Sequence, residues 1–350
     1  MVRREQIVDI CRWVLGGVFT FSGIVKCVDP VGTSVFVEKY LATFSLDLFL
    51  PLALPIAVVL SVVEFALGQL LLCGKPHRIT AVVIIVIMSL FTVVTLLNAT
   101  ILPIGDCGCF GDAVRLTPLE TLIKNIILLP LSVLMFVGAR RGRFDYLGAA
   151  TAVAISLGVC LYSLRYQPII DFMPYRVGVN LWEAVSHDRL ALDSSQSTHL
   201  VFRSIATGEE LIFASDDVEC WQREDIEFVE SRQDVVSSSS FPFAEFVLTN
   251  AEGEDCTLSF LEQNRDITLI TIYDLESLTS DRLRAVRKLL HDSENVAVIT
   301  SVDRARIVEL LGVEPYSLDA MTLRTLIRSR IGVVVLSDGA ISRKCDIRDI

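Results

Sequence analysis

Long apolar runs alternate with short polar stretches through the first 165 residues of this 350-residue chain. Each of five runs approaches the ~20 residues that a helix needs to cross the hydrocarbon core of a bilayer. They cover residues 7–27, 48–73, 79–104, 118–138 and 144–164. Arg3 and Arg4 precede the first run as they would in a signal peptide, but no Ala-x-Ala-like cleavage site ends it. The pattern therefore predicts five retained membrane spans.

Beyond residue 165 the pattern becomes that of a soluble α/β chain. Thr198–Ile205 and Glu209–Ala214 alternate polar and apolar residues on either side of a short turn, which predicts a β-hairpin. Residues 237–240 are all serine and form a plausible linker. The expected strands after it are 243–249, 256–260, 267–273 and 296–301, the expected helices are 278–291, 303–311 and 318–329, and a hairpin of 331–336 and 341–344 ends the chain.

This succession of elements is the order of a thioredoxin-like fold. The motif of its catalytic members is missing, because residues 273–278 read Tyr-Asp-Leu-Glu-Ser-Leu where a Cys-x-x-Cys would open the helix. Residues 330–332 read Arg-Ile-Gly where a cis-proline would stand. We therefore expect a binding or docking domain, in which Cys256 and Cys345 could form a bridge.

The expected fold class is a membrane α-helical bundle, with a four-helix core and a fifth span, followed by a soluble α/β thioredoxin-like domain. The expected divisions are a four-span membrane domain at 1–140, the fifth span and exit at 141–170, a β-rich lead-in and linker at 171–240, and the thioredoxin-like domain at 241–350.

Charge separates the two halves. Residues 1–165 carry 13 Lys/Arg and 10 Asp/Glu, whereas residues 166–350 carry 18 and 32, so nearly all of the net charge of −11 lies in the second half. An acidic domain of this kind repels phosphates, which argues against nucleic-acid binding.

Basic residues mark alternate loops of the membrane half. Arg3 and Arg4, Lys75 and Arg78, and the arginines of 140–143 should all face the cytoplasm under the positive-inside rule. The expected location is thus the inner membrane, with the N-terminus in the cytoplasm and the domain after residue 165 in the periplasm.

A polar Cys-x-Cys turn, Asp106-Cys107-Gly108-Cys109-Phe110-Gly111-Asp112, separates the third and fourth runs. The same topology places it outside, where disulfides persist. A Cys107–Cys109 bridge would close a small, strained ring that is easily reduced, so the two thiols are a candidate redox pair and Cys27 is a candidate third thiol. Lys26 and Lys124 lie near the same level and could stabilise a thiolate, or could only anchor helix ends in the headgroup region.

Arg12 and Glu64 are charged positions inside the first two spans. Counting residues places them ~7 Å and ~13 Å from the cytoplasmic ends, close enough in level to form an ion pair that fixes the helix register. A proton-transfer role for Glu64 is the alternative. Small residues on both helices predict close packing between them: Gly16, Thr20, Gly23, Ser61 and Gly68.

These motifs resemble the MauE/DoxX-like membrane proteins over about residues 5–140. The resemblance rests on Ser22–Lys26 with Asp29-Pro30, on Glu64 with Gly68, and on Cys107–Gly111 before Lys124-Asn125. Members with a fifth span and a trailing thioredoxin-like domain resemble the whole chain, as the stretch Tyr175–Asn180 suggests. The resemblance implies a four-helix core in the inner membrane and extracytoplasmic disulfide handling. The namesake is needed for the maturation of methylamine dehydrogenase, but we do not carry methylamine itself over to this chain.

Three functions compete on these grounds. In the first, a thiol–disulfide oxidoreductase, Cys107 and Cys109 exchange with a periplasmic redox or client protein during client maturation, and a quinone in the bundle could accept the electrons; no other cofactor is evident. In the second, the protein is a non-enzymatic anchor or assembly factor embedded in membrane lipid. Its cysteine pair is structural, and its C-terminal domain binds the partner. In the third, the two thiolates bind Cu(I), although too few further ligands are in view.

Overall fold

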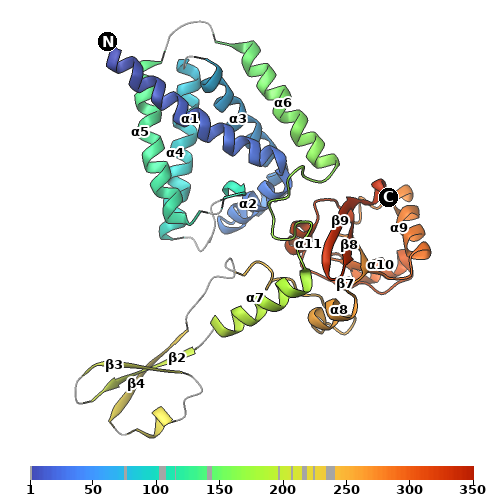
Figure 1. The fold of residues 1–350 in the computed structure, drawn as a ribbon. Coiled ribbons are helices and arrows are strands. Elements are labelled where there is room, and N and C mark those ends of the chain that lie inside the picture. The colour runs from blue at the N-terminus through green and yellow to red at the C-terminus, as the bar shows by residue number, and fades with distance from the viewer. Residues whose placement is uncertain are drawn as a thin grey trace.

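The computed structural model describes residues 2–74, 77–101, 108–114, 116–139, 144–195, 198–205, 208–214, 219–223, 225–233 and 241–350. A helical bundle comes first along the chain, and an α/β domain ends it (Figure 1). A small β-sheet, inserted between the first helix of the α/β domain and the remainder of that domain, projects away from the bundle (Figure 1).

Among the described residues, five helices are long and apolar enough to cross a membrane. They are α1 (Val2–Val28), α3 (Ala53–Cys73), α4 (Arg78–Thr100), α5 (Pro118–Gly138) and α6 (Tyr146–Arg165). Each helix overlaps one of the five apolar runs along most of its length, and a 3₁₀ turn, η1 (Asp47–Leu52), leads into α3. The prediction of a multi-pass membrane protein is confirmed.

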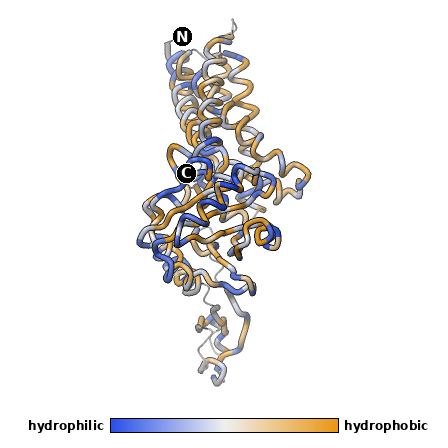
Figure 2. Tube along the Cα trace, turned by 90° about the vertical axis from the view of Figure 1, so that its right-hand side faces the viewer, coloured by the Kyte–Doolittle hydropathy of each residue, from blue (hydrophilic) through white to orange (hydrophobic). Residues whose placement is uncertain are grey.

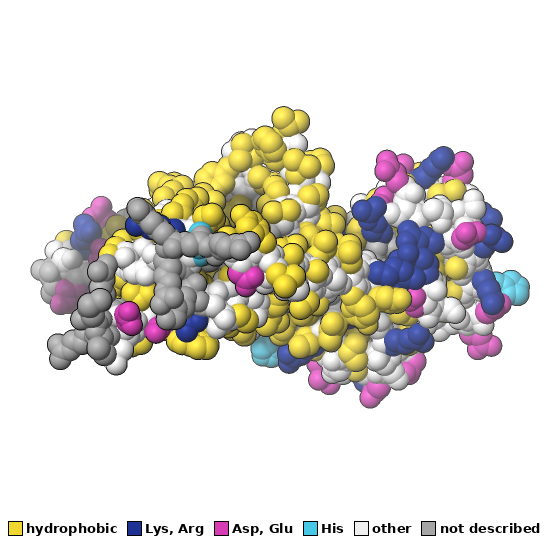
Figure 3. Space-filling view, turned by 90° about the horizontal axis from the view of Figure 1, so that it is seen from above, with side chains coloured by type: hydrophobic (Ala, Val, Ile, Leu, Met, Phe, Trp, Pro, Cys, Tyr) yellow, Lys and Arg dark blue, Asp and Glu magenta, His cyan; other side chains and the backbone are white. Residues whose placement is uncertain are grey.

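The outside of the bundle is apolar. Large hydrophobic side chains such as Val59, Val86 and Leu90 are exposed on it. Orange positions run along the helices in Figure 2, and yellow side chains cover the bundle in Figure 3, whereas charged side chains gather on the α/β domain at the right of that view. A surface of this extent calls for a lipid environment rather than water.

A short helix, α2 (Pro30–Thr43), follows α1 and had not been predicted. Asp29 caps it by accepting a hydrogen bond from the backbone N–H of Gly32 at 2.8 Å, and Pro30 occupies the first turn, where its fixed φ suits a helix start. Only residues 30–35 are buried. With 14 residues, α2 is too short to span a bilayer, so it does not belong to the long apolar runs that predict the spans.

Glycines bring the backbones of α1 and α3 into contact, as the small residues predicted. A Cβ added at Gly23 would lie 2.4 Å from the backbone nitrogen of Phe65, and one added at Gly68 would lie 2.4 Å from the backbone nitrogen of Thr20. Neither backbone atom can move aside as a side chain can. The two helices are therefore locked at this separation by residue size.

The α/β domain is built on a five-stranded sheet of order β7-β6-β5-β8-β9. Strands β5 (Ile267–Ile272), β6 (Val296–Thr300) and β7 (Tyr316–Ser317) run parallel, and β8 (Ile331–Ser337) and β9 (Ala340–Asp346) form the predicted terminal hairpin. Asp338 and Gly339 turn that hairpin with φ values of 48° and 77°. A 3₁₀ turn, η4 (Ile347–Asp349), ends the chain.

Helices α8 (Thr257–Gln263), α9 (Ser280–Asp292), α10 (Arg304–Leu311) and α11 (Ala320–Leu326) complete the domain. Successive residues of β5 point to opposite faces of the sheet. Leu269 belongs to one hydrophobic core and Ile270 belongs to the other, so the sheet is buried on both faces. Cys256 packs against the first core and Cys345 belongs to the second, and both are free cysteines, so the bridge that they could have formed is not present. The α/β class is confirmed, and the thioredoxin-like assignment stays a prediction.

The segment expected to be a β-rich lead-in supplies part of this core instead. Tyr175 is buried, and α7 (Leu181–Ser195) buries Leu181 and Val185 beside Phe246. The strand expected at residues 256–260 is also replaced by a helix, because Cys256 caps α8 and the residues after it belong to that helix. Periodicity could not show this, because α7 is held by contacts with residues far along the chain, such as the bond from the Leu181 N–H to the Gly339 carbonyl at 2.8 Å.

The predicted hairpin is present between α7 and the rest of the domain. Strands β2 (Thr198–Ser204) and β3 (Glu210–Ala214) pair antiparallel, and β4 (Ile226–Gln233) adds to β2, after the 3₁₀ turn η2 (Glu219–Gln222). Its small core contains Leu200, Phe202, Cys220 and Ile226.

The α/β domain is fixed to one end of the bundle by a buried ion pair. The Arg328 guanidinium binds the carboxylate of Asp29, with its Nη2 2.7 Å and its Nε 3.0 Å from Oδ2. Burial is the largest single influence and lowers the pKa of Arg328, but the charge and hydrogen bonds of Asp29, together with the charge of Asp171, outweigh it, so the net shift of this pKa is upward. We call the end of the bundle that carries Asp29 the docking end.

Further polar contacts surround this pair. Arg324 of α11 forms a bidentate pair with Glu38 of α2, at 2.7 and 2.9 Å. Asp171, in the segment between α6 and α7, pairs with both Arg328 and the buried Lys344. The α/β domain thus contacts α2 and the chain leaving α6 through complementary charges.

Substituting Gly23 or Gly68 by Ala should lower the free energy of unfolding by ~1–3 kcal/mol, because the new methyl group meets a backbone atom. Thermal unfolding in detergent micelles measures the effect. Gly17→Ala is the matched control, since nothing lies within 4 Å of its added Cβ. Equal stability of all three variants would contradict the backbone contact.

Replacing Arg328 by Met should undock the α/β domain, because it leaves the Asp29 carboxylate buried without its partner, a loss of about 3–5 kcal/mol. Hydrogen exchange of residues 166–175 should then speed up. In Arg330→Met, which removes a largely exposed ion pair with Asp274, the exchange rates should stay unchanged. Unchanged exchange in Arg328→Met would show that other contacts hold the domain.

Candidate functional site

The candidate site is centred on an ion pair buried inside the bundle. The Lys26 ammonium of α1 lies 2.7 and 2.8 Å from the two carboxylate oxygens of Glu64 in α3, and the residues are 3% and 1% exposed. The hydroxyl of Ser22, one turn before Lys26, also lies 2.6 Å from Glu64 Oε2. Since a charge in the hydrocarbon region is costly, mutual pairing explains how both can be present there.

The predicted pair of Arg12 with Glu64 is wrong. Arg12 instead donates to the carbonyl oxygens of Leu71 and Gly74 at 2.8 Å each, beside the C-terminus of α3. These carbonyls have no partner within the helix and carry the negative end of its dipole, so a guanidinium suits them. Equal depth in the membrane does not predict an ion pair, because it does not specify which face of a helix a side chain occupies.

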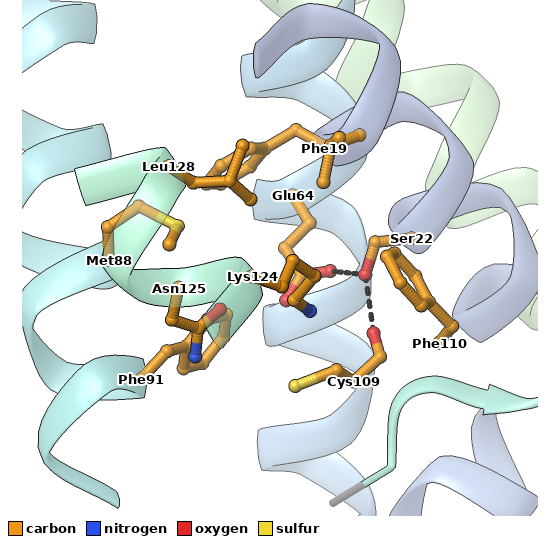
Figure 4. A pocket seen from close by; sticks show the side chains of 11 residues that line it. Phe19, Ser22, Glu64, Met88, Phe91, Cys109, Phe110, Lys124, Asn125 and Leu128 are labelled. Atoms are coloured by element: carbon orange, nitrogen blue, oxygen red, sulfur yellow. Dashed lines mark hydrogen bonds between the residues drawn. The ribbon is translucent and has the colours of Figure 1, made fainter. Parts of the chain in front are cut away.

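Cys109 lies in a tight turn pressed against this ion pair. The N–H of Gly111 donates to the carbonyl of Gly108 at 3.1 Å, and both glycines have positive φ, 53° and 63°. The Ser22 hydroxyl is also 2.7 Å from the carbonyl oxygen of Cys109, which begins the short strand β1 (Cys109–Asp112). Ser22 Oγ thus lies within hydrogen-bond distance of both the turn and Glu64, as the dashed lines of Figure 4 show, and its single proton is shared between these two acceptors.

Lys124 of α5 stands over the same turn. Its ammonium lies 4.3 Å from the ring centroid of Phe110, a cation–π distance, and Phe110 in turn packs edge-to-face on Phe21. Of the two lysines expected near the thiols, Lys26 is therefore committed to Glu64, whereas Lys124 lies beside the residue that follows Cys109.

A small pocket lies between the Lys26–Glu64 ion pair, the Cys109 turn and Lys124. Residues of α1, α3, α4, α5 and β1 line it, and its polar side chains are those of Ser22, Glu64, Lys124 and Asn125, with Cys109 at its edge (Figure 4). Its volume is about 20 Å³, room for about one water molecule. We therefore derive no step through a quinone.

The remaining predicted residues are placed elsewhere. Cys107 lies outside the described residues. Cys27 is buried in the last turn of α1. Among the residues the structure describes, no group of three or more His, Cys, Asp and Glu side chains is arranged to hold a metal ion.

One member of the site, Ser22, had no role assigned to it from the sequence. It could have been found, because it lies four residues before Lys26 and so on the same helix face.

Comparisons with known proteins bear on the bundle. Residues 4–138 match the family described as methylamine utilisation protein MauE, which confirms the resemblance for the span from α1 to α5. "Protein TlpB" of Flavobacterium psychrophilum is 37% identical over 79 residues, which are 21% of this chain and 21% of that protein. The chain therefore matches well under two thirds of the length of this curated relative. No solved structure matches the chain.

Lys26→Met and Glu64→Leu should each lower the free energy of unfolding by about 3–5 kcal/mol, because each leaves one buried charge unpaired. The double variant should recover most of the loss. Unfolding titrations in detergent micelles measure all three. Removal of the exposed Arg306–Glu309 pair is the control and should change stability by less than ~1 kcal/mol. Purely additive losses at Lys26 and Glu64 would contradict the pairing.

Proposed function

Because residues 4–138 match the MauE family and contain four of the five membrane-competent helices, we propose that this protein handles disulfides outside the cytoplasm, with Cys109 and Cys107 exchanging with a partner during maturation of a client protein. The observation that carries the proposal is the placement of Cys109. Its turn is bonded through Ser22 to a buried ion pair, and a lysine ammonium stands beside it. The orientation is part of the proposal and rests on the basic loops.

In the exchange, the thiolate of Cys109 attacks one sulfur of a partner disulfide. An S–S bond forms between Cys109 and the partner while the partner's own S–S bond breaks, and the released thiolate takes a proton from water. Cys107 then attacks the Cys109 sulfur and releases the partner's second thiolate. The partner gains two electrons and two protons, and the Cys107–Cys109 pair loses them.

The surroundings of Cys109 suit the role of attacking thiol. Its side chain is half-buried, so a partner can reach it, while the bonds of Gly111 and Ser22 hold its backbone in place. The Lys124 ammonium, next to Phe110, is close enough to favour negative charge at the turn. A thiolate held in this way reacts without a large rearrangement of the chain.

The α/β domain suits partner binding rather than electron transfer. Burial raises the pKa of the thiols of Cys256 and Cys345, so both are poor nucleophiles near neutral pH. The buried Asp29–Arg328 pair holds the domain at the end of the bundle near which the Cys109 turn lies. A partner bound by this acidic domain would lie beside that turn.

The second candidate function is an anchor or assembly factor with a structural cysteine pair. One observation favours it: the turn is already fixed by polar contacts and by Gly108, whose added Cβ would strike the Phe36 ring at 2.5 Å. A bridge there would reinforce a rigid element and need never open.

Cys107→Ser should accumulate a mixed disulfide between Cys109 and a partner, because the resolving thiol is gone. Acid trapping of intact cells, followed by non-reducing electrophoresis and mass spectrometry of the adduct, detects it. Cys109→Ser should give no such adduct. Cys73→Ser, at an exposed cysteine in the last turn of α3, is the matched control and should behave as wild type.

Client maturation separates the two functions. The exchange function predicts that either Ser variant of the turn abolishes maturation. If neither variant traps a partner and maturation continues in both, the pair is structural and the anchor function is correct.

A further inference from the structure

An exposed apolar segment joins α2 to α3 at the docking end of the bundle (Figure 1). Residues 44–52 read Phe-Ser-Leu-Asp-Leu-Phe-Leu-Pro-Leu, so Ser45 and Asp47 are the polar residues among them. No residue of η1 is buried, and Leu48 is 85% exposed, the largest value among the large hydrophobic side chains that the structure describes. We call residues 44–52 the apolar tip.

The apolar tip is a hydrogen-bonded turn. The N–H of Ser45 donates to the Ala42 carbonyl at 2.9 Å, and Ser45 has a φ of 55°, the left-handed conformation that often ends a helix. The N–H of Leu46 donates to the Leu41 carbonyl at 2.8 Å, and that of Phe49 donates to the Leu46 carbonyl at 2.9 Å. The exposure of the apolar side chains is therefore set by a defined backbone conformation.

The length of α3 indicates where the tip lies relative to the bilayer. Helix α3 has 21 residues, so it is ~31 Å long and crosses the ~30 Å hydrocarbon core without η1. The residues that precede it are therefore at the boundary of the core. Ile56 and Val59 of α3 are also exposed, so the tip continues the lipid-facing surface of the bundle.

Lipid is the occupant that this surface favours over a second copy of the chain. A stable protein interface uses roughly 20–30 residues from each side, which a turn of nine residues does not supply. A bilayer sets no such requirement, because its headgroup and acyl-chain boundary accepts short apolar surfaces. The single charge of the tip, on Asp47, lies at the start of η1 and so at the end of the apolar segment that leads into the membrane.

We propose that the apolar tip inserts into the headgroup and acyl-chain boundary of the bilayer beside α3, and that α2 is thereby held at the membrane surface as an anchor for the α/β domain. This role goes beyond disulfide handling, and it does not require exchange at Cys107 and Cys109.

Helix α2 connects the tip to the two other parts of the docking end. Its Glu38 binds Arg324 of the α/β domain at 2.7 Å, and its Phe36 ring packs on the Cys109 turn, 2.5 Å from a Cβ added at Gly108. Anchoring of α2 would fix both at the level of the membrane surface. A partner of the Cys109 turn would then have to present its disulfide next to the bilayer, a consequence that rests on the proposed function.

The test uses the full-length protein in phosphatidylcholine vesicles whose acyl chains are brominated either near the headgroup or near the methyl end. Bromine quenches nearby tryptophan fluorescence. After subtraction of the signal of the three native tryptophans, the fluorescence added by Leu48→Trp should be quenched, and more strongly by bromine near the headgroup. Leu190→Trp is the matched control, because Leu190 is a 70% exposed leucine of α7, and its added fluorescence should be unaffected by either lipid.

Phe49→Trp replaces one aromatic ring by another and should give the same result as Leu48→Trp, provided that both variants unfold at the wild-type temperature. The quenching should persist when Leu48→Trp is combined with Cys107→Ser and Cys109→Ser, so that failure of the exchange function leaves it unaffected.

Three outcomes would overturn the proposal. Stronger quenching by bromine near the methyl end would place the tip inside the hydrocarbon core. Quenching by iodide in the buffer but by neither lipid would place it in water. Protection from iodide and from both lipids would show that protein covers the tip.

Discussion

The Lys26–Glu64 ion pair is the constraint on which the membrane half depends. Neither charge is tolerable alone in the hydrocarbon region, so α1 and α3 must meet with these residues facing each other. The glycines make that meeting sterically feasible, because Gly23 and Gly68 let the two backbones touch. Ser22 then extends the network to the Cys109 carbonyl, so a polar turn far along the chain is positioned by a charge pair within the first two spans.

The same rule operates at the docking end. Asp29 serves two purposes there, since its carboxylate caps α2 and also neutralises the buried Arg328. The surrounding contacts of Arg324 and Lys344 are with carboxylates of α2 and of the segment after α6. The acidic α/β domain therefore attaches to the bundle through a local cluster of its cations, against the sign of its own net charge.

Much of the architecture followed from local patterns. The five spans are set by length and hydropathy, the strands of the first hairpin by alternation, and the terminal hairpin by its turn at Asp338-Gly339. Helix α10 ends at Gly312, which has the expected left-handed conformation with φ 72°. The Cys109 turn was recognisable in the sequence because Gly108 and Gly111 flank Cys109 and Phe110. Both glycines have positive φ in the structure.

What the sequence determined by itself was thus most of the elements, because helix length, strand alternation and turn chemistry are decided by neighbouring residues. The exceptions are α2, α7 and α8, which local patterns did not predict. The tertiary structure alone decided the partners. Glu64 pairs with Lys26 and not with Arg12, and Asp29 pairs with a residue 299 positions away. These pairings depend on how each helix is rotated about its axis and on which faces are buried together. Local patterns in the amino-acid sequence do not specify either.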